Sequence, residues 1–382
     1  MRETQKRVLV AGHLCIDITP ALAGRQAGSI AELLAPGKLV TVGAPDIHLG
    51  GVVANTGLAM QRFGADVRLC AKIGMDELGR MAERQMAAHN AQAHLIQDPQ
   101  AASSYTVVIA PPGLDRVFLH HPGANDTFCS QDIAEELLEG VSHFHFGYPP
   151  LMKRMYANGG EELIALFTRA KRKGMTTSLD MAAVDPGSPA GQADWETILK
   201  RVLPLVDCFV PSLEETVCML GRARYDAGCR RAEAGDADDG FSITRDAAPL
   251  AERLVGMGAR VALLKCGAQG ICYHTAGPAA MEALCAAYGL RPAAWENARG
   301  IVPAFVPDSV LSAAGAGDVS IAAFVTAMLR GMDLPDCVRL AAAAGACSLS
   351  AYDPLSALVP LEQLEQRIQD GWERQPEPED TP

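Results

Sequence analysis

The sequence predicts an α/β protein with a mostly parallel sheet flanked by helices, because short apolar segments of strand length alternate with amphipathic segments. The apolar segments are RVLVAG (7–12), ADVRLCAKIG (65–74), SHFHFG (142–147), MTTSLDM (175–181), DCFVP (207–211) and ARVALLKCG (259–267). Between them lie segments with apolar residues at helical spacing and a glycine at the end, such as NTGLAMQRFG, EELIALFTRAKRKG and DAAPLAERLVGMG.

One region departs from this alternation. Residues 103–123, SSYTVVIAPPGLDRVFLHHPG, contain two apolar segments joined by a Pro-Gly turn, which predicts two paired strands with no helix between them. Because parallel neighbours in a sheet need a longer crossover, we expect this hairpin to lie beside the main sheet as a small β lid. Residues 38–51, KLVTVGAPDIHLGG, are expected to add a further lid strand.

The domain organisation follows from length and composition. The 382 residues, 49% of them hydrophobic, can form a sizeable core, and we expect a single domain over residues 1–373. Residues 222–245 are polar and rich in Gly and Asp, and are expected to form an exposed insertion. Residues 374–382, RQPEPEDTP, are expected to be a disordered tail.

Charge and composition exclude several classes of protein. The net charge of -12 argues against a nucleic-acid-binding surface, and there is no polybasic stretch for a membrane surface. No apolar run approaches the roughly 18 residues of a membrane span, and the N-terminal segment breaks too early for a signal peptide. The 11 cysteines show no Cys-x-x-Cys pair and no metal spacing, so buried thiols in a reducing compartment are expected. These features predict a cytoplasmic enzyme.

Polar residues follow several of the predicted strands. They are Asp17, Asp180, Glu214, Glu215, Gly267 and Gly270. Ligands of an open α/β sheet bind outside the carboxyl ends of its strands, so these residues are candidates for a site. Each taken alone is explained as well by turns and helix caps, for which loops use Asp and Gly. Their joint occurrence indicates a functional edge of the sheet.

The segment GAGD, residues 315–318, precedes the apolar run IAAFVTAML. Gly315 and Gly317 permit close backbone approaches, and the N-terminus of the following helix offers unpaired N–H groups to an oxyanion or a phosphate. Asp318 is either a carboxylate of that site or a favourable charge in the first helical turn. No Gly-x-x-x-x-Gly-Lys-Ser/Thr occurs, and no Gly-x-Gly-x-x-Gly follows the first strand, so a P-loop enzyme and a dinucleotide oxidoreductase are not expected.

The order of the motifs resembles that of a known family. GHLCID, LGGVVANTGLAMQRFG, AKIGMDELG, HHPGAND, VPSLEE, LLKCGAQG and AAGAGDVSIAAFVTAML follow one another as in the PfkB, or ribokinase-like, carbohydrate kinases. The similarity extends from residue 7 to residue 360. It implies a Rossmann-like α/β domain that binds ATP and its acceptor at the edge of the sheet, under a β lid.

The resemblance also implies roles for single residues. Asp318 matches the catalytic base, and the N–H groups from Ala314 through Gly315 and Ala316 to Gly317 match the anion hole for the transferred phosphoryl group. The acceptor site would comprise Asp17, Gly50, Gly51, Asn55 and Asn125. The nucleotide side would comprise Lys265, Gly267, Gly270 and Ala314, with Glu215 organising Mg²⁺.

Three departures from the family pattern concern metal and cation binding. Ser312, Ala313 and Ala314 stand where relatives carry Asp-Thr-x, and the Asp of that motif helps bind a monovalent cation in many relatives. Ser212 replaces the Asn of Asn-x-x-Glu, and MAAV follows Asp180 in place of a Pro-x-Asn pattern. We therefore expect little dependence on K⁺, with Asp308 as the nearest substitute ligand.

The sequence thus predicts an ATP- and Mg²⁺-dependent kinase that phosphorylates a hydroxyl of a sugar or small polyol. A nucleoside kinase of the same fold and a catalytically silent sugar-binding regulatory protein are the alternatives. A phosphosugar acceptor is less expected, because no basic cluster surrounds HFGYPP.

A homodimer formed through the lid is a further expectation. His143 and His145 share one face of a strand, and structural roles are favoured over metal binding because no third ligand is near.

Overall fold

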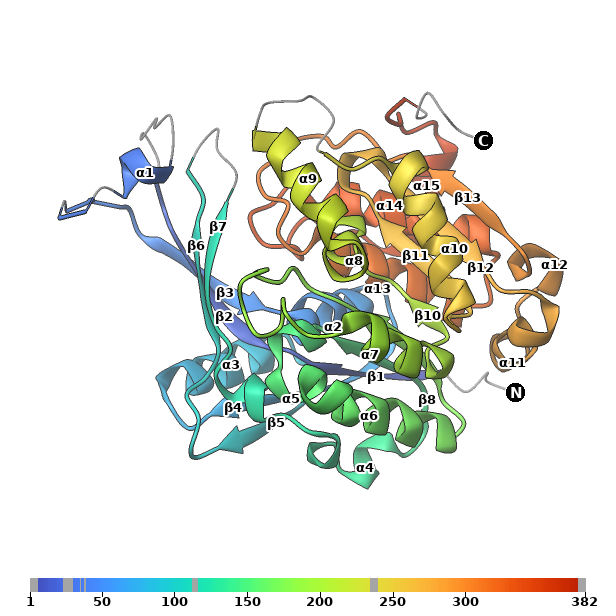
Figure 1. Ribbon diagram of the computed structural model, residues 1–382, viewed down its shortest axis with the longest axis horizontal. Coiled ribbons are helices and arrows are strands. Elements are labelled where there is room, and N and C mark those ends of the chain that lie inside the picture. Colours follow the sequence, from blue (N-terminus) through green and yellow to red (C-terminus); the bar gives the residue numbers. More distant parts are fainter. Residues whose placement is uncertain are drawn as a thin grey trace.

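The computed structural model describes residues 6–22, 30–34, 36–37, 39–111, 116–233 and 240–376. A large sheet runs through the molecule with helices on both of its faces, and a small sheet stands at one side of it (Figure 1). The predicted fold class is confirmed: the protein is α/β, with a large, mostly parallel sheet and a separate small sheet.

The large sheet has nine strands in the order β13-β12-β11-β10-β9-β8-β1-β4-β5. In chain order they are β1 (Arg7–Gly12), β4 (Asp66–Gly74), β5 (Gln92–Asp98), β8 (Val141–Gly147), β9 (Thr176–Asp180), β10 (Cys208–Phe209), β11 (Val261–Lys265), β12 (Ile271–Thr275) and β13 (Arg299–Val302). The pairs β11–β12 and β12–β13 are antiparallel, and the other pairs are parallel.

The small sheet has four strands in the order β3-β2-β6-β7. They are β2 (Cys15–Pro20), β3 (Pro45–Gly50), β6 (Tyr105–Ile109) and β7 (Val117–His121). The antiparallel pair β6–β7 is the hairpin expected within 103–123, and β3 lies in the expected segment 38–51. β2 was not expected as a separate strand. It follows β1 after two residues and carries the chain from the large sheet into the small one.

Fifteen α-helices are described. They are α1 (Ile30–Leu33), α2 (Val52–Arg62), α3 (Glu77–Ala88), α4 (Glu135–Leu138), α5 (Lys153–Tyr156), α6 (Glu161–Arg172), α7 (Trp195–Val202), α8 (Leu213–Leu220), α9 (Arg222–Glu233), α10 (Ala248–Gly256), α11 (Pro278–Tyr288), α12 (Pro292–Trp295), α13 (Ala316–Leu329), α14 (Leu334–Ser348) and α15 (Leu361–Gln369). Within the described part of the chain, no helix combines the length and the apolar composition needed to cross a bilayer.

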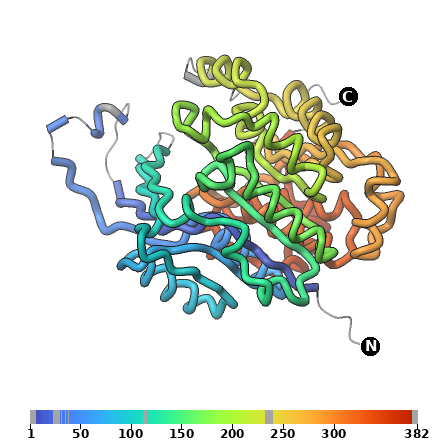
Figure 2. The backbone as a smooth tube through the Cα atoms, turned by 60° about the horizontal axis from the view of Figure 1, so that its bottom comes forward, coloured from blue at the N-terminus to red at the C-terminus, as the bar shows by residue number. Residues whose placement is uncertain are grey.

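Two hydrophobic cores lie on opposite faces of the large sheet. Along β1, Val8 and Val10 belong to one core while Leu9 and Ala11 belong to the other, because successive side chains of a strand point to opposite faces. The first core includes α2, α13 and α14, and the second includes α6, α7 and α10. The tube in Figure 2 shows the same separation, with the red C-terminal helices behind the sheet and the green helices in front of it.

α13 is buried along nearly its whole length, which its sequence explains. Between Asp318 and Leu329 every side chain is buried, since the run is apolar all round. α13 packs against α2 and α14 and so is fixed between two further helices. This packing determines where the GAGD segment at its N-terminus can lie.

The structure describes parts of the expected insertion and of the expected tail. In the expected insertion 222–245, α9 spans Arg222–Glu233, and the rings of Tyr225 and Phe241 stack with centroids 6.0 Å apart. In the expected tail, Arg374 pairs with Phe305 in an isolated bridge, so the chain is held beyond residue 373. The parts of these predictions that concern residues 234–239 and 377–382 lie outside the described residues, as do residues 112–115 of the hairpin.

Candidate active site

The carboxylate of Asp318 lies in the first turn of α13 and is 4% exposed. Asn55 Nδ2 donates to its Oδ2 at 3.1 Å, and Thr56 Oγ1 donates to its Oδ1 at 3.0 Å. The hydroxyl of Tyr148 lies 2.8 Å from Oδ1 and 2.7 Å from Oδ2. Residues far apart in the sequence therefore converge on one buried carboxylate.

The start of α13 has the geometry of an anion-binding loop. Gly315 is in the left-handed conformation with φ 71°, and a Cβ there would lie 2.7 Å from Pro354. A Cβ on Gly317 would lie 3.3 Å from Lys265 Cδ. The first N–H groups of a helix have no intrahelical partner and sit at its positive end. Amide groups and a lysine ammonium thus adjoin one another beside Asp318.

Lys265 and Asp180 form an ion pair at the carboxyl edge of the sheet. Lys265 Nζ lies 2.9 Å from Asp180 Oδ1. Burial raises the pKa of the Asp180 carboxyl above its ordinary value, although Lys265 opposes this. Burial also lowers the pKa of Lys265, but the carboxylates of Asp180, Glu215 and Asp318 outweigh it and the net shift is upward. The lysine therefore carries its charge among three acidic groups.

The other side of Asp318 faces the small sheet. His13 connects β1 of the large sheet to β2 of the small one. The centroid of its ring lies 5.1 Å from that of His120 on β7 and 5.7 Å from that of Tyr148. Burial lowers the pKa of His13 well below its ordinary value, with a further contribution from His120. Burial likewise lowers the pKa of His120 to about 4. Both imidazoles are neutral at pH 7.

Asp17 on β2 lies at the same junction. Cys15 Sγ donates to its Oδ1 at 3.2 Å, and His48 Nε2 from β3 lies 4.0 Å from its Oδ2. Burial raises the pKa of this carboxyl, an effect that Cys15 and His48 oppose. A side chain at Gly50 would overlap the Asp17 carboxylate, so the glycine keeps the space beside that group open.

Residues 5–359 match the sequence pattern of the pfkB family of carbohydrate kinases. The chain belongs to this family. The pfkB protein is therefore a phosphotransferase with an alcohol group as acceptor, as the sequence predicted, and neither the nucleoside kinase nor the silent regulatory protein is favoured.

Individual relatives agree with this assignment. This pfkB kinase is 22% identical to an "uncharacterized sugar kinase" of Archaeoglobus fulgidus over 286 residues, which cover 74% of the chain and 91% of the relative. It is 25% identical to "probable fructokinase-7" of Arabidopsis thaliana over 223 residues, or 58% of the chain and 60% of the relative.

Solved structures show the same fold. A fructokinase with bound ATP from Xylella fastidiosa superposes with a TM-score of 0.68 at 19% identity, covering 96% of this chain and 99% of that one. A ribokinase of Arabidopsis thaliana complexed with ribose and ATP gives a TM-score of 0.67 at 15% identity, with 96% and 99% covered. The ribokinase-like fold of this pfkB kinase is thus confirmed.

Four further predicted site residues of the pfkB kinase are three glycines and Asn125. Gly267 and Gly270 form the turn between β11 and β12 with φ of 55° and 107°, and a Cβ on Gly270 would overlap the Val302 carbonyl. Gly51 has φ 86° and begins α2, where a Cβ would meet His13. Asn125 donates both of its amide hydrogens, to the carbonyls of Leu14 and Pro122, so its amide holds a loop in place. Its contact with the phosphoryl acceptor stays a prediction.

Glu215 and Ser212 form a capping box at the start of α8. Ser212 N donates to Glu215 Oε2 at 2.8 Å, and Glu215 N donates to Ser212 Oγ at 3.2 Å. Serine at position 212 therefore serves as a helix cap in its own right. Glu215 also acts electrostatically on Asp180 and Lys265, so its carboxylate belongs to the charged cluster beside α13. The carboxylate oxygens of this cluster suit Mg²⁺, which proteins bind through one or two carboxylates together with the phosphates of the substrate.

The sequence reasoning did not assign functions to three residues of this site. Tyr148 directly follows β8, so the rule that sites lie after strand ends could have found it. Thr56 is next to Asn55 in α2, and both side chains point to Asp318. His13 lies within the motif GHLCID, and nothing in its local sequence distinguishes it from a core histidine.

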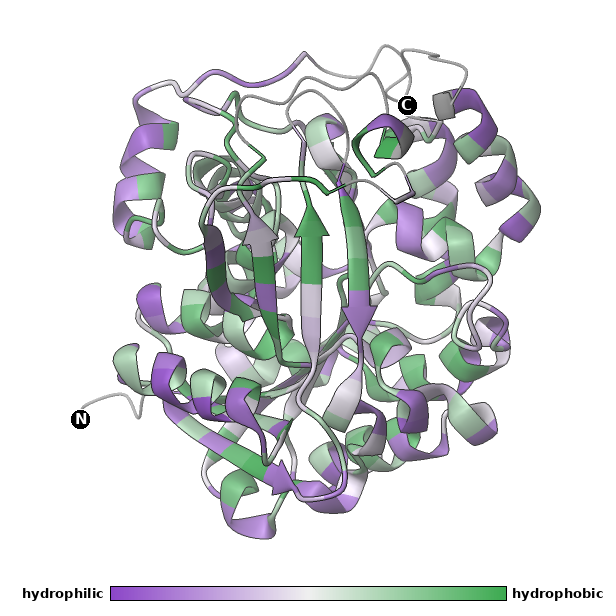
Figure 3. Ribbon diagram, turned by 90° about the vertical axis from the view of Figure 1, so that its left-hand side faces the viewer, coloured by the Kyte–Doolittle hydropathy of each residue, from purple (hydrophilic) through white to green (hydrophobic). Residues whose placement is uncertain are grey.

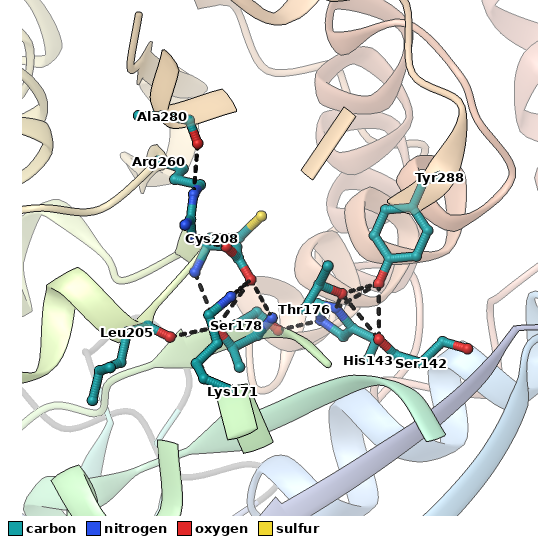
Figure 4. Close-up of polar contacts among 12 residues, drawn as sticks. Ser142, His143, Lys171, Thr176, Ser178, Leu205, Cys208, Arg260, Ala280 and Tyr288 are labelled. Carbon is teal, nitrogen blue, oxygen red and sulfur yellow. Dashed lines mark hydrogen bonds and ion pairs between the residues drawn. The ribbon is translucent and has the colours of Figure 1, made fainter. Parts of the chain in front are cut away.

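His143 and His145 belong to a buried polar network, part of which Figure 4 shows. His143 hydrogen-bonds Thr176 and Ser178 through its two ring nitrogens, each at 2.8 Å, and His145 Nδ1 lies 2.7 Å from the same serine. Among the residues that the structure describes, no three His, Cys, Asp or Glu side chains could hold a metal ion. The bonds between β8 and β9 give the two histidines a structural role.

Proposed function

We propose that this pfkB kinase transfers the γ-phosphate of ATP to a hydroxyl of an uncharged sugar or polyol, with Asp318 as the catalytic base. The observation that carries the proposal is the burial of the Asp318 carboxylate at the N-terminus of α13, beside glycine amides and Lys265. A base and an anion-stabilising loop are thereby adjacent, as in-line phosphoryl transfer requires.

In this mechanism the proton of the acceptor hydroxyl passes to Asp318 while the hydroxyl oxygen attacks the γ-phosphorus. The amides of Ala314, Gly315, Ala316 and Gly317 would stabilise the charge that develops on the transferred group. For this, Ala314 N and Ala316 N would have to turn from Ser312 Oγ and the Ala313 carbonyl to the phosphoryl oxygens. Lys265 supplies a positive charge on the nucleotide side. Gly267 leaves room there for the nucleotide to approach the backbone, and Gly270 lets the turn lie close to the Val302 carbonyl. Mg²⁺, when bound with ATP, neutralises phosphate charge, and Glu215 is the residue that would hold it through its waters.

The acceptor would lie between Asp17 and Asp318, against Gly50, Gly51 and Asn55. A carboxylate and an amide suit the hydroxyl groups of a polyol, because each can take part in several hydrogen bonds. The neighbouring imidazoles of His13 and His120 are neutral, and Lys265 is already paired with Asp180. This environment favours an uncharged acceptor over a phosphosugar or a sugar acid.

We further propose that K⁺ contributes little to catalysis. Ser312 Oγ accepts a hydrogen bond from Ala314 N at 3.2 Å, so the loop has an internal bond at the position of the missing carboxylate. The two terminal guanidinium nitrogens of Arg367 donate to the Asp308 carboxylate, at 2.5 Å and 3.0 Å. Its carboxylate would have to leave this pair to become a cation ligand.

The small sheet is proposed to close over the acceptor as a lid and to join two copies of the chain. Figure 3 shows its strands across the front of the molecule, with hydrophobic residues among them. Phe118 and Leu119 on β7 are each 54% exposed, and Ile47 on β3 is 37% exposed. Exposed large apolar groups gathered on one sheet are typical of an interface.

All 11 cysteines are free thiols, which supports action in a reducing compartment such as the cytoplasm.

The proposal is tested by a thermal-shift screen of neutral sugars, sugar phosphates and nucleosides, with and without an ATP analogue and Mg²⁺. A ligand that binds the native state raises the melting temperature by mass action. We expect shifts with the ATP analogue and with at least one neutral sugar, and ADP release when that sugar is supplied with ATP. If nucleosides or sugar phosphates raise the melting temperature and no neutral sugar does, the proposed acceptor class is wrong. If the ATP analogue leaves the melting temperature unchanged, the proposed kinase activity is wrong.

A further inference from the structure

The Asp318 carboxylate has three hydrogen-bond donors, of which the Tyr148 hydroxyl is within reach of both oxygens. Asn55 and Thr56 both reach it from α2, the helix against which α13 packs. The remaining donor is the Tyr148 hydroxyl, which lies within 2.8 Å of both oxygens and comes from the loop after β8. An acceptor hydroxyl that gives its proton to Asp318 must itself hydrogen-bond this carboxylate. Asn55 and Thr56 belong to the packed helix pair, whereas Tyr148 comes from a loop, so we infer that the acceptor hydroxyl takes the position of the Tyr148 hydroxyl.

The backbone around Tyr148 is unusual in two ways. Tyr148 is left-handed, with φ 67° and ψ 40°, which is rare for a bulky side chain. It also precedes Pro149, and a residue before proline normally adopts an extended conformation. Tyr148 N donates to the Asp180 carbonyl at 3.3 Å, and its own carbonyl accepts from Leu151 N at 2.9 Å. Such conformations persist where the surrounding structure imposes them, typically at functional sites.

The surroundings of the ring keep the hydroxyl protonated. Burial, and next the negative charge of Asp318, raise the pKa of Tyr148 well above its ordinary value. Tyr148 therefore remains a hydrogen-bond donor at neutral pH. Its ring lies 5.7 Å from that of His13, on the side of the site that faces the small sheet. The tyrosine thus contacts Asp318 with its hydroxyl and has the His13 ring beside it.

We propose that Tyr148 covers the catalytic base while no acceptor is bound: its hydroxyl occupies the place of the acceptor hydroxyl on Asp318 and excludes water from that carboxylate. The inference rests on the proposed role of Asp318. When the acceptor binds, the Tyr148 hydroxyl leaves Asp318 and the acceptor hydroxyl replaces it. Tyr148 is in this sense a specificity-determining residue, because the base becomes available to a bound alcohol and not to water.

The reaction that Tyr148 suppresses is the hydrolysis of bound ATP. A water molecule in the position of the tyrosine hydroxyl would give its proton to Asp318 while its oxygen bonds to the γ-phosphorus. The bond from that phosphorus to the bridging β–γ oxygen breaks, and the products are ADP and phosphate. Excluding water from a site of phosphoryl transfer is a recognised means of preventing this side reaction.

The test is the release of phosphate from ATP and Mg²⁺ in the absence of any acceptor. We expect Tyr148→Phe to raise this rate by about tenfold or more, because the ring remains and the hydroxyl is replaced by water. Tyr156→Phe is the matched control, since the Tyr156 ring packs against Trp195 with centroids 6.3 Å apart, and its rate should equal that of the wild type. Adding Asp318→Asn to Tyr148→Phe should abolish the increase.

Tyr148→Met is measured alongside, as a second variant of similar bulk without a hydroxyl. Loss of a merely structural residue would lower hydrolysis and sugar phosphorylation together, whereas the proposal requires hydrolysis to rise. Unchanged or lower hydrolysis in variants that bind an ATP analogue as the wild type does overturns the role of Tyr148. If the wild type itself binds no ATP analogue and phosphorylates no sugar, the proposed function fails, which is a separate outcome.

Discussion

Lys265 Nζ lies 2.9 Å from Asp180 Oδ1, and the aliphatic end of the same lysine packs against Gly317 at the start of α13. Lys265 ends β11 and Asp180 ends β9, with β10 between them. The ammonium group is thus paired within the protein and still adjoins the amides of the proposed anion hole. Its position suits a charge that is held in place before the phosphates arrive.

We expect Lys265→Met to lower turnover by about 10²–10³-fold and to raise the KM for ATP, because a charge aimed at the transferred group is lost. The single variant also leaves the Asp180 carboxyl buried without its cation, which destabilises the fold. The double variant Lys265→Met/Asp180→Asn removes both charges and should recover stability in urea without recovering turnover. Turnover near that of the wild type in the double variant would rule out a catalytic role for the lysine.

Asp17→Ala should weaken binding of the sugar by about 1–3 kcal/mol, because a buried hydroxyl of the ligand loses a charged hydrogen-bond partner. The affinity for ATP should be nearly unchanged, and isothermal calorimetry measures both. Asp46→Ala on β3 is the control, since Asp46 is exposed and bonds His48 on the side away from Asp17. Loss of ATP binding with sugar binding retained would mean that the two sites are exchanged.

The stability of the fold should depend on pH through its buried histidines. Burial, with a smaller contribution from Lys171, lowers the pKa of His143 from 6.5 to about 3 in the folded protein. The unfolded chain therefore binds a proton more readily, so the stabilisation is present above pH 6.5 and is lost as the pH falls toward 3. Between pH 7 and pH 5 this one residue should cost about 2 kcal/mol.

Urea denaturation at pH 7, 6 and 5 checks this expectation. His143→Gln should reduce the loss of stability on acidification, while the same change at the exposed His94 should leave it as in the wild type. An identical pH dependence in the wild type and His143→Gln would show that other groups dominate.

K⁺ dependence gives a further test, with initial rates compared in KCl and in tetramethylammonium chloride at equal ionic strength and fixed Mg²⁺. Equal rates are expected, because Ser312 offers a neutral hydroxyl where a carboxylate would bind the cation. A tenfold or greater increase with K⁺ would refute this expectation. If Asp308→Asn then removed the increase, Asp308 would be the substitute ligand despite its pairing with Arg367.

The strands that carry the site could be predicted from the sequence because they are short segments with apolar residues, separated by segments of helical spacing. β1, β9, β11, the hairpin β6–β7 and β3 fall within the expected segments, and β8 begins one residue before its expected segment. β5, β12 and β13 were missed. β12 follows β11 after a short turn with no α-helix between them. β5 and β13 lie at the two edges of the sheet, where half-exposed residues such as those of QAHLIQD give no apolar run. Edge strands need less burial, so their pattern is weaker.

The site was predictable only where a motif identified it. GAGD and its helix marked Asp318, and strand ends marked Asp180 and Glu215. The sequence could not reveal that Asn55 and Thr56 bond Asp318, because these contacts span more than 260 residues. The position of Tyr148 depends in addition on a left-handed backbone before a proline, a conformation that local sequence disfavours.

The central claim, that Asp318 is the base of phosphoryl transfer, is tested most directly by single-turnover phosphorylation of a bound sugar by Asp318→Asn. The account predicts a rate lower by about 10²–10⁴-fold, with binding of ATP and sugar retained, because the base acts in the transition state. Asp370→Asn, which changes an exposed carboxylate, serves as the control and should react as the wild type does. A rate for Asp318→Asn within a few fold of the wild type would contradict the account.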